Sequence, residues 1–175
     1  MALVVDDLTT AMMNAVKQCP DGGDSAFQKL GEATENYLCN NTTAIYSWTA
    51  QMTSTPFTPD PVVMFQAKLN PSGSVFSCKP NNFDDFISKF ATFLQGIKIE
   101  GASGFSLSPL QNGTGTFTAK QVGKLEDEKD VDKAMKSAFS EIAKGIINGW
   151  KSYFQTSGSG SHSAYVGSAS LTSVN

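Results

Sequence analysis

The stretch from Asn82 to Ile97 constrains the fold most, because its apolar residues recur at spacings of three and four. At 3.6 residues per turn, such positions share one stripe of a helix. The stripe consists of Phe83, Phe86, Ile87, Phe90, Phe93, Leu94 and Ile97. Asn81 or Asn82 can cap the first turn, where Asp84 and Asp85 also suit the positive helix end. A face this rich in phenylalanine needs a large apolar partner, and we expect a sheet to pack against it.

Three other stretches show the same helical periodicity. We expect helices from Asp6 to Gln18, from Asp24 or Ser25 to Asn41, and from Leu125 to Gln155. Between the first two, Cys19-Pro20-Asp21-Gly22-Gly23 interrupts the pattern with a proline and two glycines. The first two helices therefore form a predicted helical hairpin.

Strand signals occupy the middle of the chain. Thr42 to Met52 alternates aromatic or small residues with polar or β-branched ones, as a strand with two different faces does. Pro61 to Leu69 is a second strand, antiparallel to the first because of the short connection. Shorter strands are expected at Ser74 to Cys78, Ile97 to Glu100 and Thr114 to Ala119, the last as the return of an irregular hairpin or functional loop over Gly101 to Gly115.

These elements predict an α+β fold with a small antiparallel sheet packed by amphipathic helices, because helices and strands do not alternate as βαβ units. Residues 1–155 make a single predicted domain with a long C-terminal helix. Residues 156–175 are rich in glycine and serine and are expected to form a flexible tail. From Ala164 apolar residues return, so the end of the tail is either a frayed terminus or an assembly arm that adds a strand to a neighbour's sheet.

Composition argues against several functional classes. All 13 basic residues are lysines, and the net charge is −3. Without arginine, phosphoryl transfer, nucleotide binding and nucleic-acid recognition are disfavoured. The first residues lack a positively charged segment, and no window is apolar enough to span a bilayer, so we expect neither a signal peptide nor a membrane anchor.

No group of residues forms a recognisable catalytic or cofactor motif. His162 is the single histidine and lies in the glycine and serine tail, which is a poor scaffold for a catalytic or metal site. Cys19, Cys39 and Cys78 match neither a CxxC pair nor an even disulfide set, so free thiols are expected. We therefore predict a protein without enzyme activity, cofactor, metal or small-molecule substrate.

Other conspicuous residues have structural explanations. The acidic residues from Glu126 to Asp132 lack the glycine and terminal glutamate of a calcium loop, and they suit the start of a helix. Tyr46 and Trp48 share one strand face and are expected in the core more than in a ligand cage. Gly145 and Gly149 form a GxxxG spacing, which predicts a close helix crossing or a subunit contact.

The chain also resembles a known group of proteins. A small acidic domain has helices before Tyr46-Ser47-Trp48, then Pro59-Asp60-Pro61-Val62-Val63 opening a strand, then a Gly/Ser-rich tail. This arrangement is similar to small virion structural proteins of tailed bacteriophages, such as tail, baseplate and neck components. The resemblance covers residues 25 to 95 and carries no catalytic residues with it. It implies a location in the virion, and in the host cytoplasm before assembly.

The predicted function is that of a structural assembly protein that forms a homo-oligomeric ring or stack and contacts neighbouring virion proteins. No nucleic acid or membrane partner is expected. The residues predicted to contact other subunits are Gly145, Gly149, Tyr165, Val166, Leu171 and Val174. The alternative is a ligand- or peptide-binding module that uses the sheet and the Gly101 to Gly115 loop as its mouth. A hydrolase with an unrecognised serine or acid pair is a more distant alternative.

Overall fold

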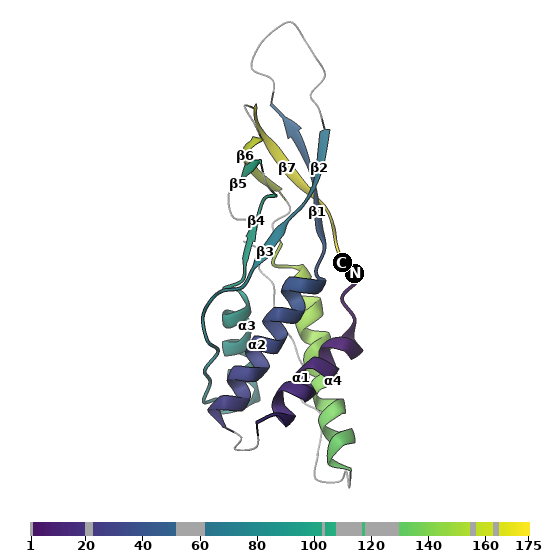
Figure 1. Ribbon diagram of the computed structural model, residues 1–175, viewed down its shortest axis with the longest axis vertical. Helices are drawn as coiled ribbons and strands as arrows, with labels where there is room; N and C mark the ends of the chain where they lie inside the picture. Colours follow the sequence, from purple (N-terminus) through teal and green to yellow (C-terminus); the bar gives the residue numbers. More distant parts are fainter. Residues whose placement is uncertain are drawn as a thin grey trace, which may run out of the picture.

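The computed structural model describes residues 2–19, 23–51, 62–102, 104–107, 117, 130–154, 157–162 and 165–175. Helices gather at one end of an elongated molecule, and the main sheet forms the other end (Figure 1). The fold is α+β with an antiparallel sheet, as predicted.

The described helices follow the predicted helical stretches. They are α1 Val5–Lys17, α2 Asp24–Asn41, α3 Phe83–Leu94 and α4 Val131–Lys151. α1 packs against both α2 and α4, and its Leu8 and Met12 are fully buried. α4 was predicted from Leu125 to Gln155, but it ends at Lys151, and residues 125–129 lie outside the described part of the chain.

The start of α3 is capped as its sequence predicts. The side-chain Oδ1 of Asn82 accepts a hydrogen bond from the backbone N–H of Asp85 at 2.8 Å. This bond satisfies one of the N–H groups that a helix leaves unpaired at its first turn. The predicted stripe is buried most deeply at Phe90 and Leu94, which are 1% and 0% exposed.

The partner of the α3 stripe differs from the prediction. Phe86 packs on Phe27 of α2 with ring centroids 5.6 Å apart. Phe90 packs on Phe76 of the 71–82 segment at 5.1 Å. A sheet was expected to pack on this face, but the ring contacts of Phe86 and Phe90 outside α3 come from α2 and this connecting segment.

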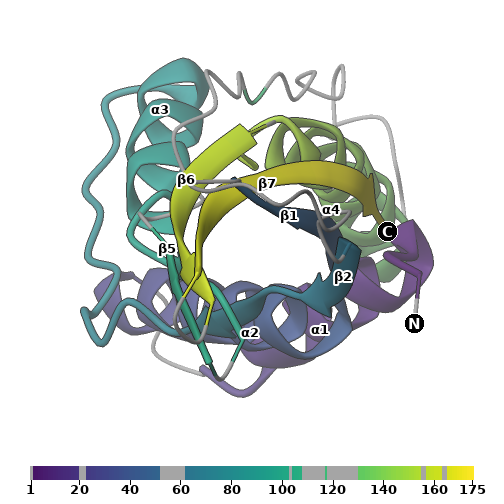
Figure 2. The ribbon, with the colours of Figure 1, turned by 90° about the horizontal axis from the view of Figure 1, so that it is seen from above.

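The main sheet contains five antiparallel strands in the order β2-β1-β7-β6-β5. The strands are β1 Ala44–Ala50, β2 Val62–Gln66, β5 Phe105–Leu107, β6 Ser157–His162 and β7 Tyr165–Val174. Viewed from above, the sheet curls around on itself (Figure 2). A separate pair, β3 Lys68–Asn70 and β4 Lys98–Glu100, leads from the sheet toward the helices (Figure 1).

Several predicted strands change in detail. The Pro61 to Leu69 strand is divided at Ala67 into β2 and β3, although the Ala67 N–H still donates to the Ala44 carbonyl of β1 at 2.8 Å. No strand forms at Ser74 to Cys78, where Phe76 and Cys78 instead point into the core. The predicted Thr114 to Ala119 strand lies, apart from Phe117, outside the described residues.

The largest correction concerns residues 156–175, which were expected to be a flexible tail or an assembly arm. Residues 157–162 and 165–174 are β6 and β7, and β7 lies between β1 and β6 inside the sheet of its own chain. A glycine- and serine-rich segment cannot bury enough surface alone, but here β7 pairs with β1 over residues 44–50, with one irregularity between Ile45 and Tyr46, and β6 pairs with β7. The end of the chain is thus a central part of the domain.

The inner face of the curled sheet is filled by aromatic side chains. Phe65 of β2 and Phe105 of β5 belong to opposite edges of the sheet, yet their rings stack with centroids 4.1 Å apart. Trp48 packs edge-on against Phe105 at 6.0 Å, and Tyr46 stacks on Phe65 at 5.6 Å. The curl therefore lets the sheet cover its own inner face, which removes the need for a helix layer there.

Candidate functional site

Gly145 and Gly149, predicted to contact a subunit or a crossing helix, are both buried in α4. The next residue, Trp150, donates its indole N–H to the Thr42 hydroxyl at 2.9 Å, which ties the end of α4 to the end of α2, just before β1. The glycine pair thus faces the interior of this chain and offers no surface to a subunit.

The other predicted contact residues all lie on β7. Tyr165 and Val166 are 61% and 57% exposed near the start of the strand. Leu171 and Val174 are half-buried and stand opposite Tyr46 and Ala44 of β1. Of these four residues, Tyr165 and Val166 are therefore accessible to a neighbouring subunit, whereas Leu171 and Val174 are partly covered by their own chain.

His162 occupies an ordered position that its sequence context did not suggest. Its ring stacks on Phe105 with centroids 4.1 Å apart and lies edge-on to Trp48 at 5.3 Å. Tyr46 and Trp48 are fully buried, as expected for core residues, and burial raises the pKa of Tyr46 to about 12. The Trp48 indole N–H has no hydrogen-bond acceptor among the described residues. These residues make a packed aromatic interior.

The cysteines and the described acidic residue at the start of α4 have structural surroundings. Cys19, Cys39 and Cys78 are free thiols, and burial, aided by the Glu35 carboxylate, raises the pKa of Cys39 to about 11. A thiol with a raised pKa is a poor nucleophile at neutral pH. Asp130 caps α4 by accepting hydrogen bonds from two backbone N–H groups. Across the described ranges, no three histidine, cysteine or acidic side chains converge on a metal site.

The first candidate surface is the outer face of the main sheet, which presents rows of hydroxyl groups. We call it the hydroxyl face; it comprises Ser47, Thr49, Ser106, Ser157, Ser159, Ser161, Ser168 and Ser170. In one row, Ser170 stands opposite both Ser47 and Ser157. In the next row, Ser168 stands opposite Thr49 and Ser159. Neighbouring strands lie about 4.8 Å apart, so the hydroxyls form a regular array.

The hydroxyl face is exposed and lacks charge. The five strands of the main sheet contain no lysine, aspartate or glutamate. Three exposed apolar residues, Val62, Met64 and Val166, extend the hydroxyl rows, and they are 64%, 53% and 57% exposed. Edge strands are commonly protected by lysine or proline, yet β2, an edge strand, has neither between Val62 and Gln66.

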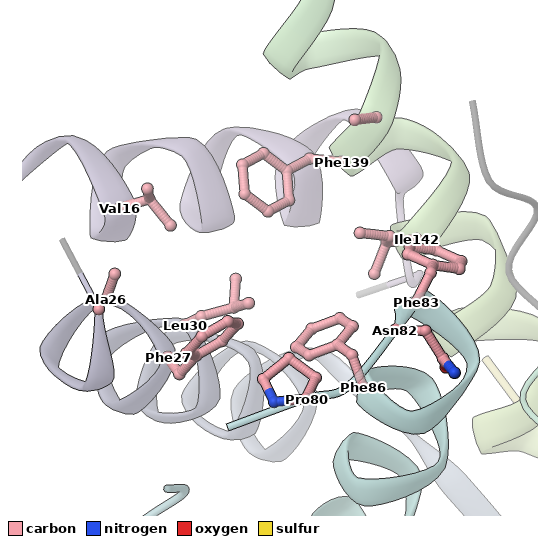
Figure 3. Close-up of a pocket in the computed structure, with 12 residues that line it drawn as sticks. Val16, Ala26, Phe27, Leu30, Pro80, Asn82, Phe83, Phe86, Phe139 and Ile142 are labelled. Carbon is pink, nitrogen blue, oxygen red and sulfur yellow. The ribbon is translucent and has the colours of Figure 1, made fainter. Parts of the chain in front are cut away.

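The second candidate site is an apolar cavity of about 560 Å³ at the helical end (Figure 3). We call it the helix cavity. Its lining residues are Val16, Gly23, Ala26, Phe27, Leu30, Pro80, Asn82, Phe83, Phe86, Ala138, Phe139 and Ile142. Figure 3 shows that Val16 and Phe139 point toward Leu30 and Phe86 across the space. Asn82 is the one polar side chain among these lining residues, and its Oδ1 is already engaged in the α3 cap.

The lysines beside the helix cavity are already paired. Lys17, Lys29 and Lys79 each adjoin a lining residue in the sequence. Their ammonium groups contact the carboxylates of Asp132 at 2.9 Å, Glu32 at 2.9 Å and Asp24 at 3.5 Å. The cavity therefore has apolar walls and no unpaired lysine adjoining them in the sequence.

The alternative binding site predicted from the sequence stays a prediction. The sheet and the Gly101 to Gly115 loop were expected to form its mouth. Of that loop, residue 103 and residues 108–115 lie outside the described part of the chain. The helix cavity is a different site, lined by residues of α1, α2, α3 and α4 and by Pro80.

Both sites had partial signals in the sequence. Serine alternates with glycine from Ser157 to Ser161, which is the period of a strand with one small and one polar face. That composition is also typical of a flexible linker, and the prediction for this segment is a flexible tail. For the helix cavity, Phe83 and Phe86 belong to the predicted α3 stripe, but no local pattern brings Val16 and Phe139 to them.

Comparison with known proteins adds no further assignment. No family model, curated protein or solved structure matches this chain. None of the described helices combines the length and apolar character needed to cross a membrane.

Proposed function

We propose that this protein is a non-enzymatic structural component that assembles with copies of itself through the hydroxyl face. The bacteriophage virion suggested by the sequence resemblance is the proposed setting, with other virion proteins as further neighbours. The observation that carries the proposal is the exposed, uncharged outer face of the main sheet.

Charge is distributed unequally between the two ends of the molecule. The described lysines, aspartates and glutamates lie on the four helices, on β3 and β4, and on the segments that flank them. Two copies that meet through their helical ends bring many charges together. Two copies that meet through the described strands of the main sheet bring no lysine, aspartate or glutamate of those strands together, so like-charge repulsion between the strands does not oppose the contact.

The composition of the hydroxyl face also suits an interface. Protein interfaces are distinguished from other surfaces less by overall hydrophobicity than by depletion of charge at their centre. Here Val62, Met64 and Val166 supply apolar area, and the serines supply short hydrogen-bonding groups. Short side chains lose little conformational entropy when they are immobilised, compared with lysine or glutamate.

A contact between two identical faces can be tested by adding charges to them. In an isologous contact the same patch of both copies takes part, so charges added near the centre of the patch on one copy lie close to the same charges on the other. The double variant Ser168→Lys/Ser170→Lys should remain monomeric at concentrations where the wild type associates. The double variant Ser168→Glu/Ser170→Glu should behave in the same way.

The decisive experiment is to mix the lysine double variant with the glutamate double variant. Analytical ultracentrifugation should show that the lysine and glutamate variants associate with each other, since opposite charges then meet, although neither associates alone. Ser88→Lys, an exposed position on α3, is the control and should leave association unchanged. The proposal fails if the wild type stays monomeric up to millimolar concentration, or if the two double variants associate as the wild type does.

A further inference from the structure

The helix cavity plays no part in the proposed assembly, because it lies at the helical end of the molecule and the hydroxyl face lies on the sheet (Figures 1 and 3). The helix cavity is partly open at the surface of the molecule, as small-molecule sites usually are. A space of about 560 Å³ lies within the range of small-molecule sites, which is about 300–1,000 Å³. Its size alone therefore calls for an explanation.

Water is a poor occupant of this space. An ordered water forms about three hydrogen bonds with polar groups around it, and water held against apolar walls lacks such partners on that side. The lining offers the Asn82 side chain at its edge, and that side chain already accepts the N–H of Asp85. Water that lacks hydrogen-bonding partners is released favourably when an apolar group replaces it.

The residues that line the helix cavity indicate which class of ligand fits it. Phe27, Phe83, Phe86 and Phe139 contribute aromatic rings, and the Phe27 and Phe86 rings lie 5.6 Å apart. Rings of this kind pack well against flat or branched hydrocarbon. An anionic ligand such as a fatty acid needs a cation, but Lys17, Lys29 and Lys79 are already paired with carboxylates.

We propose that the helix cavity is a binding site for an uncharged, apolar small molecule with a ring or a branched hydrocarbon skeleton. The ligand contacts all four helices at once. Binding therefore adds contacts among α1, α2, α3 and α4 that the protein alone does not make, and it stabilises the helical end.

The probe for this site is N-phenyl-1-naphthylamine, an uncharged aromatic molecule whose fluorescence rises in apolar surroundings. Titration of the wild-type chain should give saturable binding of one probe per chain. The anionic analogue 1-anilinonaphthalene-8-sulfonate should bind more weakly, because Lys17, Lys29 and Lys79, which adjoin lining residues in the sequence, are already paired with carboxylates.

A matched pair of variants locates the bound probe. Ala138→Phe places a ring inside the cavity from α4 and should weaken probe binding about tenfold or more. Ser137→Phe adds the same ring at the adjacent, exposed position of α4 and should leave binding unchanged. If Ala138→Phe does not fold, as judged by circular dichroism, Ala26→Leu fills the cavity from α2 and takes its place.

Three results would overturn the proposal. One is the absence of saturable binding to the wild type, as expected if other parts of the chain fill the space. Another is equal probe affinity in the wild type and in the folded cavity-filling variant. The third is equal or tighter binding of the anionic analogue. None of these results bears on assembly through the hydroxyl face, which is read from the mass of the protein in solution.

Discussion

At the scale of single residues, Gly167 shows how closely the curled sheet is packed. A Cβ atom built on Gly167 would lie 2.7 Å from Cζ2 of Trp48 and would also meet the carbonyl oxygen of Thr49. Real Cβ atoms do not approach other atoms so closely. Glycine is needed here because the Trp48 indole lies directly against the β7 backbone.

Gly167→Ala should therefore destabilise the fold by about 1–3 kcal/mol, the usual cost of extra volume in a packed core. Urea unfolding, followed by circular dichroism at one fixed protein concentration, measures the change. Ser168→Ala is the control, because Ser168 is the exposed neighbour on the same strand. Equal midpoints for Gly167→Ala and the wild type would show that Trp48 does not pack against this backbone.

At the scale of elements, α3 joins the helices to the connecting segment rather than to the main sheet. Its phenylalanines contact Phe27 of α2 and Phe76 of the 71–82 segment, and they also supply one wall of the helix cavity. One helix face thus has two roles. Phe90 serves the core and is 1% exposed, whereas Phe83, nearer the start of the helix, is half-buried and lines the cavity.

Phe90→Ala should be among the most destabilising single substitutions. The loss of a fully buried phenylalanine costs about 3–5 kcal/mol, a large part of the stability of a typical domain. Chemical unfolding of Phe90→Ala beside Ser88→Ala, an exposed position on the same helix, separates the core effect from any change in helix propensity. A midpoint for Phe90→Ala close to that of the wild type would mean that this face does not form the core.

At the scale of the whole molecule, the last strand of the chain lies inside the sheet. β7 pairs with β1 over residues 44–50 and with β6 over residues 157–162. The Asn175 and Thr43 backbones also exchange hydrogen bonds of 3.0 and 2.8 Å. The sheet therefore depends on contacts between the two ends of the sequence, which form slowly because a long loop must close first.

Deletion of residues 157–175 should accordingly abolish cooperative folding, because it removes two of the five strands and separates β5 from β1. Thermal unfolding followed by circular dichroism should show no sharp transition. A synthetic peptide of residues 157–175 should restore the transition in part, since it can pair with the exposed edge of β1. A truncated chain that melts like the full-length protein would instead mean that these residues are a dispensable tail.

Elements whose apolar residues repeat at a short, regular spacing could be predicted from the sequence. The three- and four-residue spacing around Phe86 and Phe90 predicts α3, and the alternation around Tyr46 and Trp48 predicts β1. These patterns are sufficient because the residues that share a face are close neighbours in the chain. The α+β class follows from the order of such elements, as the structure confirms.

Only the tertiary structure shows that residues 157–162 form a strand and not a linker. Their alternation of serine with glycine suits both a linker and a strand, and the choice depends on a distant partner. β1 supplies that partner through β7: Trp48 stands opposite Ala169, and its indole lies against the backbone of Gly167, where a Cβ atom would not fit. The hydroxyl face and the helix cavity could not be predicted for the same reason. Each is formed by segments far apart in the sequence, and the local spacing of residues does not indicate which distant segments will come into contact.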